Sequence, residues 1–463
     1  MNNRSFPWAD FLKKVAVIAV PVALQNLLTT TGSMIDTMMI ASLGNTEVGA
    51  VGLCAQFSSL MFSGYWGFVG GGMLFFSQYW GAKDDDGINR SYGLTLTCMM
   101  AVGFLFCALA TLCPGAVMRL YTDKQEIQAI GVEYLRIVGF SYPLMVLSMA
   151  MASLLRCTEQ VRLPLYGSIT AVATNIFLNW VLIFGHFGLP AMGVRGAALA
   201  TLIAQCVNLT VVVALARAKG HPYLLAVSRH FRWDGALIRA YFRKCFPILC
   251  NEVLIGVGNM VINIVLGRQS TEAIAAIAVF RTLEGLVIGF FAGFSNAASV
   301  LVGTKVGAGE LDTAYKRAWR LVYLCQGFIG LIGVLLIALH TPILTLMGMR
   351  GASFSIAFGL ICIYAAASLI RMGNWTQNDT FRAAGDATYG TVLEIVFMWA
   401  MVLPCVWVTG MVLHLPTLLV FACCYVDEPI RYVLMQRHLF NGKWIKPVTP
   451  EGRAALAGWK PER

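Results

Sequence analysis

Charged residues are scarce in this chain. Only 12% of its 463 residues are Asp, Glu, Lys or Arg, whereas 58% are hydrophobic. A soluble domain carries about twice that charged fraction, and the mean hydropathy of +0.71 is far from that of such a domain. The composition therefore excludes an ordinary soluble fold and indicates a chain that crosses a membrane many times.

Sequence signatures of enzymes and of metal centres are also missing. No HExxH, GxSxG or Walker A pattern occurs, and the thirteen cysteines contain no Cys-x-x-Cys pair. Cysteines inside apolar runs act mainly as small hydrophobic side chains. We therefore predict that the chain is not an enzyme and that it holds no cofactor.

Long apolar runs recur from one end of the chain to the other. A helix needs about 20 apolar residues to cross a hydrocarbon core of roughly 30 Å, and a β-barrel would show short alternating segments instead. We predict an all-α membrane protein with twelve transmembrane helices, at residues 15–40, 49–78, 91–114, 129–154, 164–186, 192–217, 240–266, 273–303, 318–338, 355–381, 389–411 and 414–436.

The net charge of +11 lies mainly outside these runs. Most Lys and Arg residues fall in the N-terminus, in the even-numbered connections and in the C-terminal tail. The positive-inside rule places these segments, and so both termini, in the cytoplasm. The basic residues therefore orient the chain in the membrane, and they do not indicate a nucleic-acid partner.

The sequence matches itself after a shift of 226 residues, which places Pro21 on Pro247 and Arg156 on Arg382. Matches at a single register indicate a duplication. We predict two six-helix lobes related by an internal parallel repeat, as in some transporters. The expected parts are an N-lobe (1–216, helices 1 to 6), a cytoplasmic basic linker (217–239), a C-lobe (240–437, helices 7 to 12) and a cytoplasmic basic tail (438–463).

Asp36 lies in the apolar stretch TGSMIDTMMIASLG. An ionised carboxylate at mid-membrane costs on the order of 2.5 to 3.5 kcal/mol, so Asp36 must be protonated, paired or bound to a cation. We interpret it as a proton or sodium site; the alternative is a carboxylate at a helix end that reaches interfacial water. Pro21 in the same run removes a backbone hydrogen bond and predicts a bend.

Asn175 and Asn179 lie four residues apart in TNIFLNWVLIFG and so share one helix face. Amide oxygens beside Asp36 would form a site for a hard cation such as Na⁺. The alternative is hydrogen bonding between helices, which is common for Asn in membranes. The spacing does not choose between the two.

Glu252 lies near the middle of the seventh run, where a carboxylate can bind an organic cation or a second proton. The alternative is an ion pair with an intramembrane arginine such as Arg281. The other charges in the runs are interpreted first as structural: Arg281 with Glu284, Glu394 with Arg371, and a cytoplasmic ion network formed by Asp379, Arg382 and Asp386.

Seven stretches match family motifs in order and spacing: PVALQNLLTTTGSMIDTMMIASLGN, GFVGGGMLFFSQYWGAKD, NIFLNWVLIFG, LPAMGVRGAALAT, GFSNAASVLVGTKVGAGELDTA, FRAAGDATYG and DEPIRYVLMQRHLFNGKWIKPVT. Over nearly its whole length the chain resembles the multidrug and toxic compound extrusion (MATE) family. The resemblance implies secondary active efflux of amphipathic, often cationic compounds in exchange for Na⁺ or H⁺, by alternating access of two lobes. It also implies a monomer in a prokaryotic inner membrane, with small organic molecules and the bilayer as its partners.

The resemblance also assigns roles to individual residues. The coupling-ion positions of the family fall on Asp36, Asn175, Asn179 and Thr201, and the helix bend falls on Pro21. Glu252 matches a C-lobe carboxylate implicated in coupling or in cation binding. Asn179 departs from the pattern, because several family members carry a second Asp there, and this departure lowers the charge of the expected site.

Two other functions compete with efflux. A flippase for lipid-linked precursors in the same broad superfamily would need a cationic cleft for pyrophosphate, whereas the central charges placed here are mainly acidic. A non-transporting membrane protein is the second alternative. A count of carboxylates near the substrate path separates the first alternative from an exporter of cations.

Overall fold

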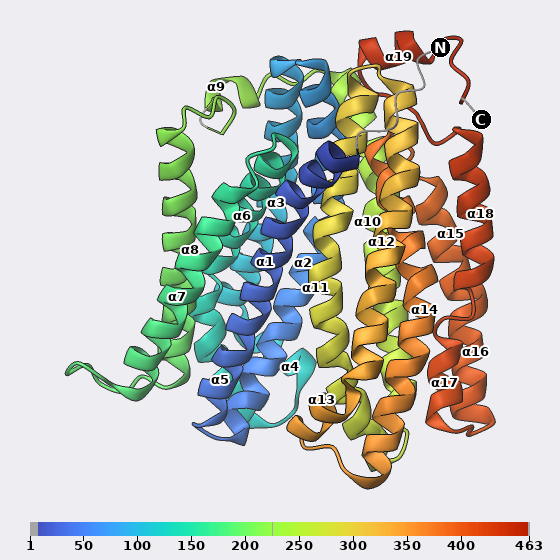
Figure 1. Cartoon of the computed structure of the whole chain (residues 1–463). Helices are drawn as coiled ribbons and strands as arrows, with labels where there is room; N and C mark the ends of the chain where they lie inside the picture. Colours follow the sequence, from blue (N-terminus) through green and yellow to red (C-terminus); the bar gives the residue numbers. More distant parts are fainter. Residues whose placement is uncertain (1–7, 225, 462–463) are drawn as a thin grey trace. The chain divides into compact units, whose positions relative to one another are not determined.

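The computed structural model describes residues 8–224 and 226–461, and these residues form helices almost throughout. Within those ranges there is no β-strand, and the one isolated bridge pairs Gly385 with Ile445. The predicted all-α membrane fold is therefore confirmed. Figure 1 shows the helices along the chain.

The described residues of the first half form nine helices. They are α1 (Trp8–Ala41), α2 (Asn45–Ala82), α3 (Asp85–Leu112), α4 (Pro114–Tyr121), α5 (Gln125–Val138), α6 (Ser141–Cys157), α7 (Arg162–Phe184), α8 (Val194–Ala218) and the short α9 (Val227–His230).

The second half begins with four long helices and ends with shorter segments. The long ones are α10 (Gly235–Leu266), α11 (Thr271–Gly307), α12 (Leu311–Ala338) and, after α13 (His340–Leu346), α14 (Gly351–Ala383). The rest are α15 (Tyr389–Phe397), the π-helix η1 (Met398–Val402), α16 (Leu403–Trp407), the π-helix η2 (Val408–Val412), α17 (Thr417–Cys423), α18 (Glu428–Asn441) and α19 (Pro450–Leu456).

Every one of the twelve predicted runs lies on these helices. Nine described helices are long and apolar enough to cross a membrane, and α5 with α6, bent by 50° at their junction, makes a tenth span. The remaining two predicted runs correspond to α2, which has 38 residues, and to α17 followed by α18. The helices therefore agree with the predicted spans.

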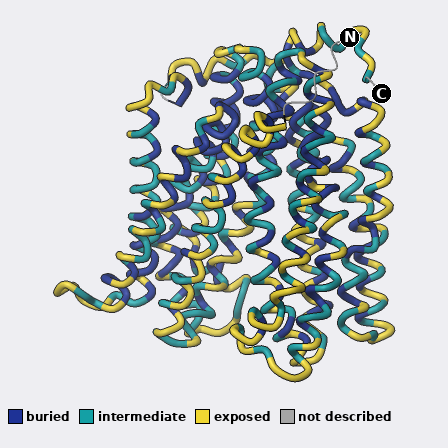
Figure 2. The backbone as a smooth tube through the Cα atoms, in the orientation of Figure 1, coloured by how far each residue is buried: buried dark blue, intermediate teal, exposed yellow. Residues whose placement is uncertain are grey.

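Figure 2 shows that buried, intermediate and exposed residues alternate along the long helices. Large hydrophobic side chains are exposed along the spans, for example Met38 at 71%, Phe104 at 59% and Val334 at 64%. Such side chains would be unfavourable in water but are suited to a hydrocarbon solvent. This exposure pattern is the one expected of a multi-pass membrane protein.

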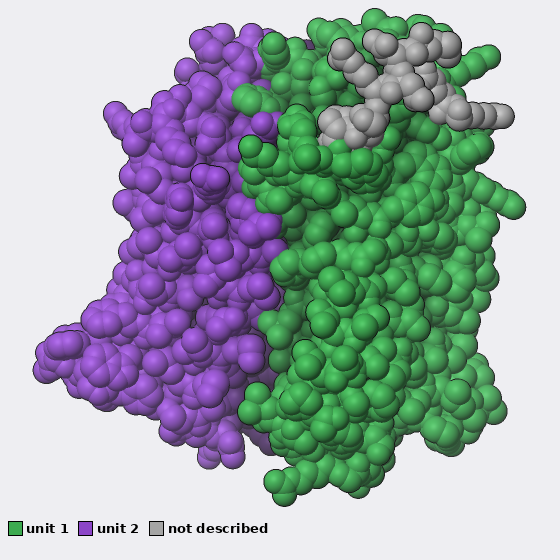
Figure 3. All heavy atoms as spheres, viewed as in Figure 1, with its two compact units in different colours: residues 1–19, 77–84, 242–463 green, residues 20–76, 85–241 purple. Residues whose placement is uncertain are grey.

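The chain forms two compact units, which Figure 3 shows in different colours. One comprises the described parts of residues 1–19, 77–84 and 242–463, and the other comprises residues 20–76 and 85–241. The predicted lobes 1–216 and 240–437 overlap these units without matching their boundaries. The boundary in α1 falls between residues 19 and 20, directly before Pro21.

The last turns of α2 cross α11 with almost no space between the backbones. A Cβ atom at Gly307 would clash with the Gln78 carbonyl oxygen, and one at Gly81 would clash with the Thr304 carbonyl oxygen. The shift of 226 residues exchanges these two contacts, since it places Gly81 on Gly307 and Gln78 on Thr304. The duplication is therefore visible in the packing of this crossing.

The C-terminal segment, defined here as residues 442–459, folds back over this crossing. Thr449 donates a hydrogen bond to the Gly307 carbonyl at 2.8 Å, and the Val448 amide donates to Gln78 Oε1 at 2.7 Å. Gln78 Nε2 in turn donates to the Ala383 carbonyl at 2.8 Å. One buried glutamine therefore connects the ends of α2 and α14 to the C-terminal segment.

Candidate functional site

Three helices of the first half bring the predicted coupling residues together. Asp36 on α1 accepts a hydrogen bond from Asn179 Nδ2 on α7 at 2.6 Å. The same Nδ2 group lies 3.3 Å from Asn175 Oδ1, one turn earlier on α7. Asn175 Nδ2 lies 3.4 Å from Thr201 Oγ1 on α8. The four residues therefore form one continuous polar chain.

Oxygen atoms are the potential cation ligands of this cluster. Asn179 is fully buried, and its Oδ1 atom has no hydrogen-bond partner among the described residues. A buried carbonyl oxygen without a donor costs roughly 1–3 kcal/mol, so it favours a cation or a proton donor close by. Asp36, Thr201 and this oxygen are the type of ligands that Na⁺ takes. The residues present therefore fit a small hard cation or a proton.

Tyr134 on α5 adds a side chain that the sequence did not predict, because it lies close to Thr201 and Asp36. Tyr134 is itself buried, with 9% of its surface exposed. No motif or spacing links residue 134 to Asp36, so only the structure identifies it. It closes the cluster on the side of the bent α5 and α6 pair.

Pro21 lies within α1, which continues as one helix from Trp8 to Ala41. The missing N–H of Pro21 leaves the carbonyl of Val17 without its helical donor. One turn later, Gln25 donates to Ser168 Oγ on α7 at 2.9 Å and accepts from Arg156 at 2.9 Å. The segment that follows Pro21 is thus tied to α6 and α7 by side-chain hydrogen bonds.

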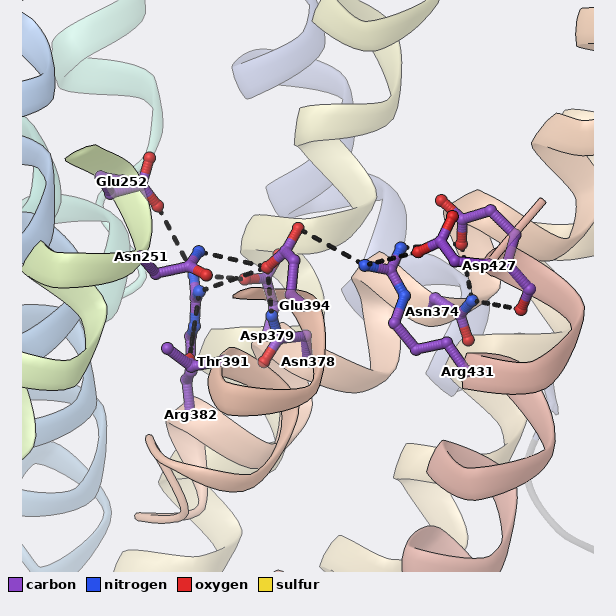
Figure 4. A network of polar contacts seen from close by, with 11 residues as sticks. Asn251, Glu252, Asn374, Asn378, Asp379, Arg382, Thr391, Glu394, Asp427 and Arg431 are labelled. Atoms are coloured by element: carbon purple, nitrogen blue, oxygen red, sulfur yellow. Dashed lines mark hydrogen bonds and ion pairs between the residues drawn. The ribbon is translucent and has the colours of Figure 1, made fainter. Parts of the chain in front are cut away.

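A second polar cluster occupies the second half of the chain (Figure 4). Glu252 on α10 lies 3.9 Å from Arg382 near the end of α14. Arg382 also lies 3.8 Å from Asp379 and 4.0 Å from Glu394 on α15. The Thr391 hydroxyl accepts from its guanidinium at 3.3 Å. One arginine is therefore shared by three carboxylates.

Glu394 is held from several sides. Its Oε2 atom accepts from Asn251 Nδ2 at 3.1 Å and from Asn378 Nδ2 at 3.2 Å. Its Oε1 atom lies 4.0 Å from Arg431 on α18. Amide N–H groups that converge on one oxygen favour an ionised carboxylate, which accepts hydrogen bonds and donates none. Glu394 is therefore held in place between the two arginines.

Arg431 belongs to the second part of this cluster. It lies 2.8 Å from Glu428 and 3.6 Å from Asp427, and Asn374 donates to Glu428 at 2.7 Å. Across both parts, five carboxylates face two arginines. The acidic groups are Glu252, Asp379, Glu394, Asp427 and Glu428.

Three of the predicted ion-pair assignments change. The predicted pair of Arg281 with Glu284 is confirmed at 2.6 Å, but Arg371 joins the same carboxylate at 3.1 Å. The predicted pair of Glu394 with Arg371 is therefore wrong. Arg281 is also not the partner of Glu252, because it lies with Glu284 and Asn263, and Arg382 takes that place.

The third change concerns Asp386, which does not join Asp379 and Arg382. It accepts from His438 Nε2 at 3.0 Å and from Lys446 Nζ at 2.9 Å, on α18 and in the C-terminal segment. Burial raises the pKa of the Asp386 carboxyl, but hydrogen bonds from His438 and Lys446 outweigh this effect and hold that pKa below its ordinary value. Asp386 therefore anchors the C-terminal segment.

Comparison with known proteins places this architecture in a family. The model of the MatE family matches residues 21–181 and again residues 247–408. The chain belongs to the MatE family. The two matches begin at Pro21 and Pro247, which are the residues that the shift of 226 superimposes. The family match thus repeats the internal duplication.

Relatives of this MatE member are named as transporters. The chain is 26% identical to "Probable multidrug resistance protein YoeA" of Bacillus subtilis (strain 168), over 85% of each chain. Crystal structures of MATE in the bent and in the straight conformation match its fold with TM-scores of 0.82 and 0.83. Both structures are 14% identical to this chain in sequence, and each match covers 94% of it. The match spans 98% of the chain in the bent structure and 99% of the chain in the straight structure. The chain is accordingly a multi-pass membrane transporter and not an enzyme.

Proposed function

We propose that this MatE member is a secondary active multidrug antiporter that exports amphipathic organic cations in exchange for Na⁺ or H⁺. The observation that carries the proposal is the chain of contacts from Asp36 through Asn179 and Asn175 to Thr201. It places a half-buried carboxylate and an unpaired amide oxygen inside transmembrane helices, where a charge is costly unless a cation neutralises it.

In this proposal Asp36, Asn175, Asn179 and Thr201 bind the coupling ion. Loading changes the charge at Asp36, and a change in local charge biases a helix between two packings. Pro21 supplies the flexible point on the same helix, close to the boundary between the compact units. The bent and straight conformations named for the MATE structures are the kind of pair that this step requires.

Glu252 is proposed as the C-lobe carboxylate for cation binding or for coupling. The N-lobe (1–216) and the C-lobe (240–437) would alternate access, joined by the linker 217–239. Both termini, including the tail 438–463, are proposed to be cytoplasmic, with the transporter a monomer in a prokaryotic inner membrane. Each coupled charge contributes up to about 2.3 kcal/mol per 100 mV of membrane potential.

Export of ethidium from everted membrane vesicles tests the proposal, with Na⁺ and H⁺ gradients imposed separately. We expect one gradient to drive export by the native protein, and Asp36→Asn to reduce that export to the background of empty vesicles. Asp123→Asn makes the same chemical change at an exposed position and serves as the matched control. Undiminished gradient-driven export by Asp36→Asn, at native protein levels, would contradict the assigned role of Asp36.

A further inference from the structure

The cluster around Arg382 has an unusual balance of charge. Within it Glu252, Asp379 and Glu394 lie at 3.9, 3.8 and 4.0 Å from the same guanidinium. These three distances are nearly equal, and each exceeds that of a close charge-assisted hydrogen bond, about 2.7–2.9 Å. Arg382 is therefore not committed to any one carboxylate.

The three carboxylates differ in how else they are held. Glu394 accepts from two amide groups and also faces Arg431. Asp379 accepts from Ser295 on α11. For Glu252 the structure gives one polar contact among the described residues, the ion pair with Arg382. Glu252 is thus the member whose charge depends most on Arg382.

We propose that Arg382 is a resident counter-cation of this site, and that a cation arriving at Glu252 displaces the guanidinium toward Asp379 and Glu394. The guanidinium stays anchored by Thr391 and has two further anions within reach, so it can leave Glu252 without becoming unpaired. Arrival of an organic cation then exchanges one positive charge for another at Glu252. This inference rests on the proposed role of Glu252 in binding cations.

The arrangement predicts opposite effects for two neighbouring substitutions. Removing the resident cation with Arg382→Gln leaves Glu252 free for an incoming cation, which should then bind more tightly. Removing one competing anion with Glu394→Gln leaves Arg382 fewer alternatives, so it should hold Glu252 more firmly and weaken binding. An arginine that only stabilised the fold would not produce opposite changes.

The test measures ethidium binding to the purified full-length protein in lipid nanodiscs, by fluorescence anisotropy and without an ion gradient. We expect Arg382→Gln to lower the Kd roughly tenfold and Glu394→Gln to raise it several-fold, as close charges in a medium of low dielectric would require. In the double variant Arg382→Gln/Glu394→Gln the arginine through which Glu394 acts is absent, so the Kd should stay close to that of Arg382→Gln. Arg382→Lys keeps the positive charge, and its Kd should stay near the native value.

Arg281→Gln is the matched control, because Arg281 also pairs with a buried glutamate in this half but lies outside the Arg382 cluster. Thermal unfolding of each variant checks its folding; if Arg382→Gln does not fold, Glu394→Gln and the double variant still carry the test. Equal or same-direction changes for the two single variants would overturn the inference, as would native protein that binds no ethidium. Native protein that binds ethidium with the expected variant pattern but exports none would reject the antiport function alone.

Discussion

The first half of the chain has Gln25, Arg156 and Ser168 at the positions where the second half has Asn251, Arg382 and Glu394. Both sets make corresponding contacts. In the first half the Gln25 amide donates a hydrogen bond to Ser168, and in the second half the Asn251 amide donates one to Glu394. The arginine is present in both, but its surroundings differ. In the second half, three carboxylates surround it.

The comparison separates what the fold requires from what each half has acquired. Glycines at the crossing of α2 and α11 occur in both copies, because two backbones in contact leave no room for a Cβ atom. Carboxylates are not needed for that packing. Glu252 and Asp379 correspond to Asn26 and Ser153. Glu252 and Asp379 are therefore not required by the packing that both halves share.

The two halves also differ in where along the helix the acidic group lies. Asp36 is ten residues farther along α1 than the position equivalent to Glu252 on α10. At 1.5 Å per residue, this is about 15 Å along the helix axis. The two halves therefore carry their acidic groups at different positions along equivalent helices.

The largest predicted effect on stability concerns Glu284, which corresponds to Ser58 in the first half. Glu284→Gln removes the buried anion shared by Arg281 and Arg371, and should lower the free energy of unfolding by roughly 3–5 kcal/mol. Ser58→Ala removes a 3.0 Å hydrogen bond with Tyr142 and should cost about 1 kcal/mol. Thermal unfolding of the two variants in the same detergent compares these losses of stability. Equal losses would show that the ion pairs of Glu284 do not stabilise the second half more than a neutral hydrogen bond stabilises the first.

The next largest effect on stability is predicted at the close crossing of α2 and α11, where both halves have a glycine. Gly307→Ala and Gly81→Ala each place a Cβ atom against a carbonyl of the opposite helix, and should each destabilise the protein by about 1–3 kcal/mol. Gly285→Ala on α11 is the control, since its Cβ would meet nothing within 4 Å. The readout is again the unfolding temperature. A loss at only one of the two crossing glycines would show that the copies are not equivalent there.

A further prediction concerns Asp386, whose partners belong to the second half and to the C-terminal segment. Because its pKa is held below the ordinary value of about 3.9, its stabilising contribution is present above that pH and is lost as the pH falls through the folded-state pKa. Asp386→Asn should cost roughly 1–3 kcal/mol at neutral pH. It should also flatten the decline in unfolding temperature below about pH 4, which a pH series of melting curves measures. An unchanged acid profile would contradict this role.

The smallest effect is expected at an ion pair of the first half. Glu133 and Arg195 lie 2.6 Å apart, but their side chains are 50% and 56% exposed. Water screens such a pair, so Glu133→Gln should change the free energy of unfolding by no more than about 1 kcal/mol. Melting curves compared with those of Glu284→Gln give the contrast between an exposed and a buried pair. A loss as large as that of Glu284→Gln would contradict the screening argument.

The sequence predicted the helices well because apolar runs of this length have one stable solution in a membrane. It also indicated Asn175 and Asn179 as neighbours of Asp36, since a lone carboxylate among apolar residues and two amides on one helix face are local features. Thr201 was implied by the family resemblance, and Tyr134 was not predicted. Ion pairing was harder to predict. Arg371 and Arg281 had several carboxylates within plausible reach, and only the packing of α11 on α14 decides that both contact Glu284.

Three of the described helices, α1, α2 and α10, contribute residues to both compact units, and this division limits how related genes can recombine. Trp8 packs under Arg320, with 5.6 Å from the guanidinium carbon to the ring centroid, and residues 77–84 belong with the second half as well. Exchange of whole halves between related genes, with a junction in the linker 217–239, would therefore replace segments that belong to the compact unit of the second half. The two copies are thus expected to be inherited together. A chimera should fold best when its junctions lie near residues 20, 77, 85 and 242 rather than in the linker alone.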